Sequence, residues 1–264
     1  MIDFKAEIKK AKAKISENKI EAIVLGPSGA GKSALGGTFP GKTLYIYGSA
    51  ENHGPKSATT YGGNKVDPIC IDDNRTPDEA IAALNAILDS TDFIKQYDAI
   101  VLDGATVIES IIRQTTAYKT ACLTSKGVHN TFAEGPAVLS VINPILNKLR
   151  DSGKHYLVTC ILDVQEMDSE TGEIVESKPR LSTYAVAESV IQQFPDIFVV
   201  GPMSNGEITA HRLQFAAGIR RDSKDDTGIV KKTINFKPRL TGVKSIPNTL
   251  PADMNEVLKL KKGE

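Results

Sequence analysis

The stretch Val24-Leu25-Gly26-Pro27-Ser28-Gly29-Ala30-Gly31-Lys32-Ser33 decides the fold of this chain. It matches the pattern G-x-x-x-x-G-K-[ST], a loop that wraps its backbone around a chain of phosphates. Gly29 and Gly31 permit backbone conformations that turn successive N–H groups toward an anion. A helix that starts at Lys32 would point its positive end at the same anion. The stretch therefore predicts a site for a nucleoside triphosphate.

The residues on either side supply the strand–loop–helix order that this motif requires. Residues 20–25 form a short apolar run that is typical of a buried strand, and residues 33–35 can open a helix. The alternative is a glycine-rich turn that binds nothing, and this order disfavours it. We expect Lys32 to reach the β- and γ-phosphates and the Ser33 hydroxyl to ligate Mg²⁺. The candidate residues for binding ATP and Mg²⁺ are Gly26, Pro27, Ser28, Gly29, Ala30, Gly31, Lys32 and Ser33.

The composition is that of an ordinary globular protein, with 264 residues, 41% of them hydrophobic and 24% charged. This length suits one large α/β domain or two small ones. No apolar run approaches the length that spans a membrane, and the charged N-terminus has no signal-peptide core. Cys70, Cys122 and Cys160 are too few and too scattered for a disulfide framework or a zinc site. Reduced thiols and no membrane partner predict a cytoplasmic protein.

The formal net charge is zero, but the charge is unevenly distributed along the chain. From residue 211 to residue 264 there are twelve Lys and Arg against six Asp and Glu. A basic C-terminal part can serve nucleic acid or a neighbouring subunit. An ordinary solvated basic surface explains the same count equally well.

Apolar segments alternate with helical patterns through the first two thirds of the chain. The expected strands are residues 20–25, 43–47, 66–71, 97–103 and 155–161. One intervening helix begins at a capping box made by Thr76 and Glu79, and another covers residues 137–150 with a kink at Pro144. The polar residues 114–135 are interpreted as a loop. This order predicts a mostly parallel sheet with helices on both faces.

The pattern changes to shorter, antiparallel signals after residue 162. The expected features there are a hairpin tip at 170–173, a helix at 185–193 and strands at 196–200, 207–215 and 229–236. The predicted organisation is an N-terminal helix at 1–19, a core at 20–205 and a β-rich basic C-terminal extension at 206–264, packed on the core.

Two acidic positions follow strands whose ends should meet at the phosphate-binding loop. Asp103 ends a buried strand, where ligands bind in open α/β sheets, and would hold Mg²⁺ through water. A carboxylate at a strand end is also a common cap. Glu51 follows strand 43–47 and would orient and polarise an attacking water. Spacing alone equally allows a surface acid at Glu51, and Asp72 and Asp73 compete for its role.

Strand 155–161 carries a further polar candidate. Thr159 or Cys160 would lie beside the γ-phosphate if their strand runs between the strand of the loop and the strand of Asp103. Ordinary core packing is the alternative for both residues.

Taken together, these residues resemble the RecA-like ATPase core. The shared order is a strand, then Ala50-Glu51-Asn52-His53, then a capped helix from Pro77, then an apolar strand that ends in Asp103. Within that class the chain is similar to small phage-encoded ATPases associated with single-strand annealing and recombination. The stretches that carry this similarity are residues 37–40, 158–160, 179–181, 196–200 and 236–240.

The resemblance implies roles for residues that the motifs alone leave open. It implies Glu51 as the catalytic base, with Lys32 and Asp103 completing the catalytic set. It also implies a homo-oligomer with ATP at its subunit interfaces, in which Lys237 or Arg239 reaches a neighbour's γ-phosphate.

The same resemblance implies that residues 114–135 and 163–182 face single-stranded DNA. Lys178 and Arg180 would then contact its phosphates. Tyr118 and Phe132 are the main aromatic residues there, so base stacking would be sparse. Ile161 stands where the related phage proteins often carry a histidine.

The sequence thus predicts an α/β protein with a RecA-like P-loop NTPase core. Its expected function is Mg²⁺-dependent ATP hydrolysis on single-stranded DNA in phage-type recombination or annealing, in the host cytoplasm if the chain is phage-encoded. The alternative is a nucleotide-gated protein-interaction module without DNA binding. A small-molecule kinase would need an Arg-rich lid over the phosphates, which the C-terminal region does not obviously supply.

Overall fold

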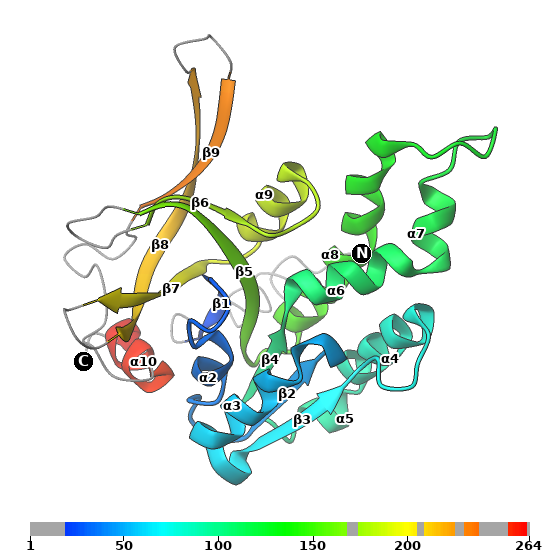
Figure 1. The fold of residues 1–264 in the computed structure, drawn as a ribbon. Coiled ribbons are helices and arrows are strands. Elements are labelled where there is room, and N and C mark those ends of the chain that lie inside the picture. The colour runs from blue at the N-terminus through cyan, green and yellow to red at the C-terminus, as the bar shows by residue number, and fades with distance from the viewer. Residues whose placement is uncertain (1–18, 168–173, 205–208, 225–229, 238–252, 263–264) are drawn as a thin grey trace, which may run out of the picture.

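The computed structural model describes residues 19–167, 174–204, 209–224, 230–237 and 253–262. Its centre is a run of six parallel strands in the order β3-β2-β4-β5-β1-β7 (Figure 1). Their bounds are β1 Glu21–Gly26, β2 Thr43–Tyr47, β3 Val66–Cys70, β4 Ala99–Asp103, β5 His155–Met167 and β7 Asp196–Ser204. The predicted α/β class with a mostly parallel sheet is confirmed.

Helices cover both faces of this sheet and make two separate cores. On one face pack α4 (Pro77–Asp89), α6 (Ala105–Gln114), α8 (Glu134–Asp151) and α9 (Tyr184–Gln192). On the other pack α2 (Lys32–Gly36), α3 (His53–Gly62) and α10 (Met254–Lys262). Along β1, Ile23 and Leu25 enter the first core while Ala22 and Val24 enter the second. Burial on both sides explains why the strands are continuous apolar runs.

Antiparallel strands extend the sheet at β7 and at the far end of β5. They are β6 (Ile174–Pro179) beside β5, β8 (Thr209–Lys224) beside β7 and β9 (Val230–Lys237) beside β8. Figure 1 shows β8 and β9 as a two-stranded ribbon that reaches beyond the parallel strands.

Capping residues and prolines in the sequence predict several features of individual helices and strands. Thr76 caps α4, and its side chain and that of Glu79 form the predicted capping box. Pro68 lies in β3, the edge strand of the sheet, where a missing N–H is tolerated. The helix α8 begins at Glu134 and runs through Pro144 to Asp151, three residues longer at its N-terminus than expected.

The interpretation of residues 114–135 as a loop is wrong. The segment contains α7 (Thr116–Ala121), the 3₁₀ turn η3 (Thr131–Ala133) and a β-bridge between Leu123 and His129. The side chain of Thr115 caps α7, while Tyr118 and Cys122 are buried against neighbouring helices. These tertiary contacts stabilise a helix too short to show a periodic pattern.

Two further turns, η1 and η2, and three further helices, α3, α5 and α10, were not predicted. Residues 48–54 hold the 3₁₀ turn η1 (Ser49–Glu51) and the start of α3, rather than a plain loop. The turn η2 (Gly63–Lys65) and the short helix α5 (Thr91–Ile94) complete the connections. The C-terminal helix α10 was missed within a part expected to be β-rich.

Several predicted features fall outside the described residues: the N-terminal helix, the hairpin tip at 170–173 and Arg239. The first residues of the strand expected from 207 also fall outside, and β8 is described from Thr209. The division of the chain at residues 19 and 205 stays a prediction.

Candidate functional site

A cavity of about 310 Å³ lies where the glycine-rich loop meets the carboxyl end of β4 and the middle of β5. Its wall comes from the loop and the start of α2, the turn η1, the first turn of α3, the end of β4, and the part of β5 that lies beside the end of β1. This is the edge at which open α/β sheets bind ligands. The candidate residues Ser28, Gly29, Gly31, Lys32, Ser33, Glu51, Asp103 and Thr159 all line it.

Two glycines give the loop its path around the cavity. Gly29 and Gly31 have φ angles of 78° and 90°, in the region that side chains rarely adopt. Gly31 also precedes the first residue of α2, so the N-terminus of that helix opens into the cavity. The loop therefore aims backbone N–H groups and a helix end at one place.

Lys32 folds back on the loop that carries it. Its Nζ donates hydrogen bonds to the carbonyl oxygens of Gly26 and Pro27, each at 2.9 Å. Burial lowers the pKa of Lys32, and the nearby carboxylates of Asp103 and Glu51 oppose this shift. The ammonium group is thus held in the cavity wall by carbonyl oxygens that another set of acceptors can replace.

Asp103 is the most heavily bonded side chain of the site. It is only 1% exposed. Its Oδ2 accepts a hydrogen bond from Ser33 Oγ at 3.0 Å and another from the hydroxyl of Tyr45. Its Oδ1 accepts from Thr159 Oγ1 at 2.5 Å. One carboxylate therefore joins three elements, α2, β2 and β5, to β4.

Tyr45 is the residue of this group that the sequence analysis missed. It lies on β2 in register with Val101, two residues before Asp103, so the two side chains lie on the same face of neighbouring strands. Burial raises the pKa of Tyr45 well above its usual range, which keeps the phenol protonated. The sequence shows a tyrosine within an apolar strand, but it does not show that this strand lies beside the strand of Asp103.

Glu51 enters the cavity from the turn η1. A Cβ placed on Gly104 would lie 3.1 Å from Glu51 Cγ, so the backbone after Asp103 passes close to this side chain. Burial raises the pKa of Glu51; Asp103 adds to the increase and Lys32 opposes it. A carboxylate with a raised pKa beside a lysine is a suitable proton acceptor.

The competing acids lie elsewhere. Asp72 accepts hydrogen bonds from the backbone N and the side chain Oγ of Ser49, at 2.6 and 2.8 Å, and so anchors the turn that carries Glu51. Asp73 is exposed. Neither of them lines the cavity.

Strand β5 does lie between β1 and β4, as the role of Thr159 requires. Thr159 Oγ1 accepts a hydrogen bond from Gly104 N at 2.7 Å while it donates to Asp103, and Ile161 also lines the cavity. Cys160 belongs to the opposite core, where burial raises its pKa to about 12. Of these two candidates, the geometry places only Thr159 at the cavity.

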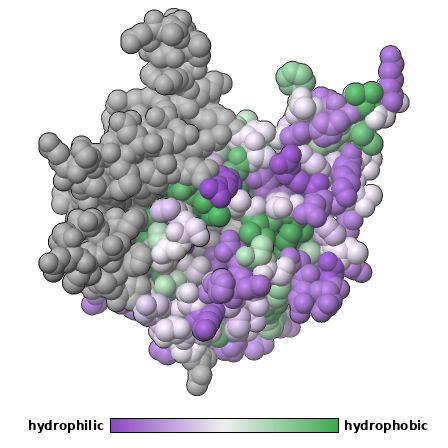
Figure 2. All heavy atoms as spheres, in the orientation of Figure 1, coloured by the Kyte–Doolittle hydropathy of each residue, from purple (hydrophilic) through white to green (hydrophobic). Residues whose placement is uncertain are grey.

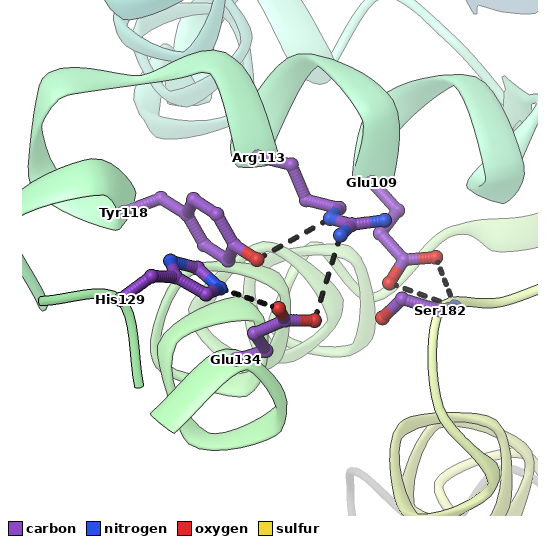
Figure 3. A network of polar contacts seen from close by, with 6 residues as sticks. All are labelled: Glu109, Arg113, Tyr118, His129, Glu134 and Ser182. Carbon is purple, nitrogen blue, oxygen red and sulfur yellow. Dashed lines mark hydrogen bonds and ion pairs between the residues drawn. The ribbon is translucent and has the colours of Figure 1, made fainter. Parts of the chain in front are cut away.

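A second cavity, of about 540 Å³, lies beyond α6. Figure 3 shows the polar network in its wall. From α6, Glu109 accepts from Ser182 N with both carboxylate oxygens, at 3.0 and 2.9 Å. Arg113 donates to the hydroxyl of Tyr118 at 3.3 Å and lies 3.5 Å from Glu134.

This second cavity brings together the two segments that were expected to face DNA. Tyr118 and His129 come from residues 114–135, and Arg180 and Ser182 come from residues 163–182. His129 Nε2 lies 2.7 Å from a carboxylate oxygen of Glu134. Arg180 is exposed.

Three predicted cations are not described at the side-chain level. Lys178 lies on β6 opposite Asp163 of β5, and Lys237 is the last residue of β9. Their side chains, like the whole of Arg239, lie outside the described residues. Their predicted roles stay predictions.

No protein-family model matches this chain, and no curated protein matches it. Among the described helices, none has both the length and the apolar character needed to cross a bilayer.

Proposed function

We propose that this protein is a RecA-like P-loop ATPase that binds and hydrolyses ATP with Mg²⁺. The observation that carries the proposal is the contact between Ser33 Oγ and Asp103 Oδ2, 3.0 Å apart at the end of a glycine-rich loop. A parallel sheet with β5 between β1 and β4 is consistent with such a core.

The donor atoms and the space both suit the proposed ligands. Ser33 and Asp103 offer hard oxygen atoms, the type that Mg²⁺ prefers. The positive φ angles of Gly29 and Gly31 give the loop a concave backbone, and about 310 Å³ lies within the range of small-ligand pockets. Ser33 would hold the metal directly and Asp103 would hold it through water, and the metal would neutralise phosphate charge.

The chain's own residues have separate tasks in the proposed reaction. Lys32 exchanges its two carbonyl partners for phosphate oxygens. Glu51 accepts the proton of a water whose oxygen attacks the γ-phosphorus, as the bond to the β–γ bridging oxygen breaks. Thr159 holds the carboxylate of Asp103 and the backbone of Gly104 in fixed positions beside this reaction.

ATP hydrolysis by purified variants tests this function. Lys32→Ala is expected to lower the rate by about 100-fold or more, because a cation aimed at developing phosphate charge is lost. Glu51→Gln is expected to bind ATP and turn it over slowly. Asp73→Asn, a nearby exposed acid outside the cavity, is the matched control. Hydrolysis by Glu51→Gln at the wild-type rate would reject Glu51 as the base.

The proposed partner is single-stranded DNA, in recombination or annealing. Its support is that the two segments expected to face DNA meet at the second cavity, with Arg113 and Arg180 in its wall. Phe132 is 92% exposed and can stack on a base, whereas Tyr118 is buried and bonded to Arg113. Assembly into a homo-oligomer with ATP at the interfaces is part of the proposal and rests on the resemblance alone.

A nucleotide-gated protein-interaction module is the second candidate. The exposed apolar side chains of Leu123, Val128 and Phe132 favour it, because they gather on one projecting connection. In Figure 2 apolar spheres lie at that projection, between α7 and α8. Binding of a fluorescent oligothymidine, measured with and without ATP, separates the two functions. Only an ATPase that acts on single-stranded DNA is required to bind the oligonucleotide.

A further inference from the structure

We propose that Tyr45 is a positioning residue of the magnesium site, whose buried hydroxyl holds the carboxylate of Asp103 against Ser33. The inference rests on the proposed function, because it concerns how the chain orients Asp103 toward Mg²⁺. No motif in the sequence assigns a role to Tyr45.

Three hydroxyl donors surround the carboxylate of Asp103. An ionised carboxylate has about four acceptor positions. Thr159 uses one on Oδ1, while Ser33 and Tyr45 use two on Oδ2. This arrangement leaves room for a metal-bound water and fixes the rotation of the carboxylate, which a single donor would not do.

The length of the Tyr45 side chain suits its distance from Asp103. β2 pairs directly with β4, and a side chain at position 45 must extend along the sheet to meet a carboxylate two residues farther on. A serine or threonine at this position is too short for that distance. Tyr45 is fully buried, and its phenol extends far enough to place a hydroxyl on Oδ2.

Gly54 leaves the space that this contact occupies. A Cβ on Gly54 would lie 2.1 Å from Asp103 Oδ2 and 3.0 Å from the Tyr45 hydroxyl. The start of α3 therefore closes over the tyrosine–carboxylate pair only because it has no side chain at this position.

The hydroxyl of Tyr45 is buried on an apolar face of the sheet. Tyr45 belongs to the second core, together with Val24, Leu35 and Val101. A buried phenol without an acceptor costs free energy that phenylalanine would not. The hydroxyl of Tyr45 donates to Asp103, so it acts on that carboxylate and not on packing alone.

Tyr45→Phe tests the proposal, because it keeps the ring and removes the donor. The measurement is binding of a fluorescent, non-hydrolysable ATP analogue, titrated with Mg²⁺ and repeated in EDTA. We expect the Mg²⁺ concentration at half-maximal effect to rise about tenfold, as when a residue that orients a metal ligand is lost. Affinity in EDTA should not change.

Tyr47→Phe is the matched control. Tyr47 lies on the same strand and the same face, in register with Asp103, and it is partly exposed. Its substitution removes the same hydroxyl group from a position that does not line the cavity. The Mg²⁺ midpoint of this variant should equal that of the wild-type protein.

Two results would overturn the role of Tyr45: an unchanged Mg²⁺ midpoint, or an equal loss of affinity in EDTA. If Tyr45→Phe does not fold, Gly54→Ala tests the same contact, because its Cβ displaces the carboxylate from the hydroxyl. An unchanged midpoint in that folded variant would also overturn the inference. If the wild-type protein binds the analogue neither with nor without Mg²⁺, the proposed function itself fails.

Discussion

At the scale of single residues, the site is defined by two carboxylates in different surroundings. Asp103 is surrounded by three hydroxyl donors. Glu51 lies at the cavity edge, where burial and the charge of Asp103 disfavour its ionised form. Environments that differ in this way separate a metal-binding carboxylate from a proton acceptor.

The raised pKa of Glu51 has a consequence for stability. A carboxyl group whose pKa is higher in the folded state stabilises the fold at low pH and loses this contribution as pH rises through the folded pKa. Glu51→Gln, which cannot ionise, should therefore melt above the wild-type protein at pH 7.5. The difference should shrink toward pH 4. Thermal denaturation of both proteins across this range is the measurement, and a lower melting temperature for Glu51→Gln at pH 7.5 would contradict the assignment.

The sequence identified most of these residues but not their contacts. Ser33 and Asp103 follow from a motif and from a strand-end acid, and both line the same cavity. Tyr45 could not be found in this way, because its role depends on which strands are neighbours. The strand order β2-β4-β5-β1 is a long-range property that local patterns do not contain.

At the scale of elements, α6 connects the two cavities. It begins directly after Gly104, whose backbone lies beside Glu51 and Thr159. One face of the helix then carries Thr106, which donates to the carbonyl of Arg180, and Glu109, which accepts from Ser182 N. A shift at the N-terminal end of α6, beside the first cavity, would therefore reach the segment that contains Arg180.

Glu109→Ala should loosen that segment while leaving the first cavity intact, because Glu109 does not line it. Glu109 is only 4% exposed, and its loss leaves the Ser182 N–H without its acceptor, at a cost of about 1–3 kcal/mol. The melting temperature should fall, and amide exchange at Ser182 should become faster. Ser110→Ala, an exposed neighbour on the same helix, is the control. Unchanged exchange at Ser182 would show that the bond does not hold the segment.

A helix could be predicted from the sequence where its own residues stabilise it, and it was missed where contacts with other elements do so. The helix α4 has a complete capping box and an apolar face, and it was found. The helix α7 has six residues and depends on Tyr118 packing among other helices, so it is too short to show a periodic pattern.

At the scale of the whole molecule, the C-terminal helix packs on the face of the sheet that carries α2 and α3. Met254 N donates to Thr38 Oγ1 at 2.9 Å, and Asn255 Nδ2 donates to the carbonyl of Thr38 at 3.1 Å. Met254 and Val257 are fully buried in the core that also contains Leu35 of α2. Helix α10 thus supports the helix that follows the glycine-rich loop.

Thr38→Val should weaken this support. It keeps the shape of the side chain but leaves the Met254 N–H without an acceptor, so we expect a loss of about 1–3 kcal/mol in the free energy of unfolding. Urea denaturation measures this change. Thr60→Val, an exposed threonine whose hydroxyl bonds within its own helix, is the control. Equal effects of the two substitutions would argue against a supporting role for α10.

Binding of single-stranded DNA at the second cavity would involve residues that are far apart in the sequence. Phe132→Ala should weaken oligothymidine binding by about 1–3 kcal/mol, the loss of one stacked base.

Arg180→Ala should instead flatten the salt dependence, by about 0.7 in the slope of log affinity against log salt. Fluorescence anisotropy at several salt concentrations distinguishes these effects. Val128→Ala, an exposed apolar residue of the same projection, is the control for Phe132. If the wild-type protein binds no oligonucleotide while ATP is still hydrolysed, the exposed side chains of this projection are better explained as a contact surface for a protein partner.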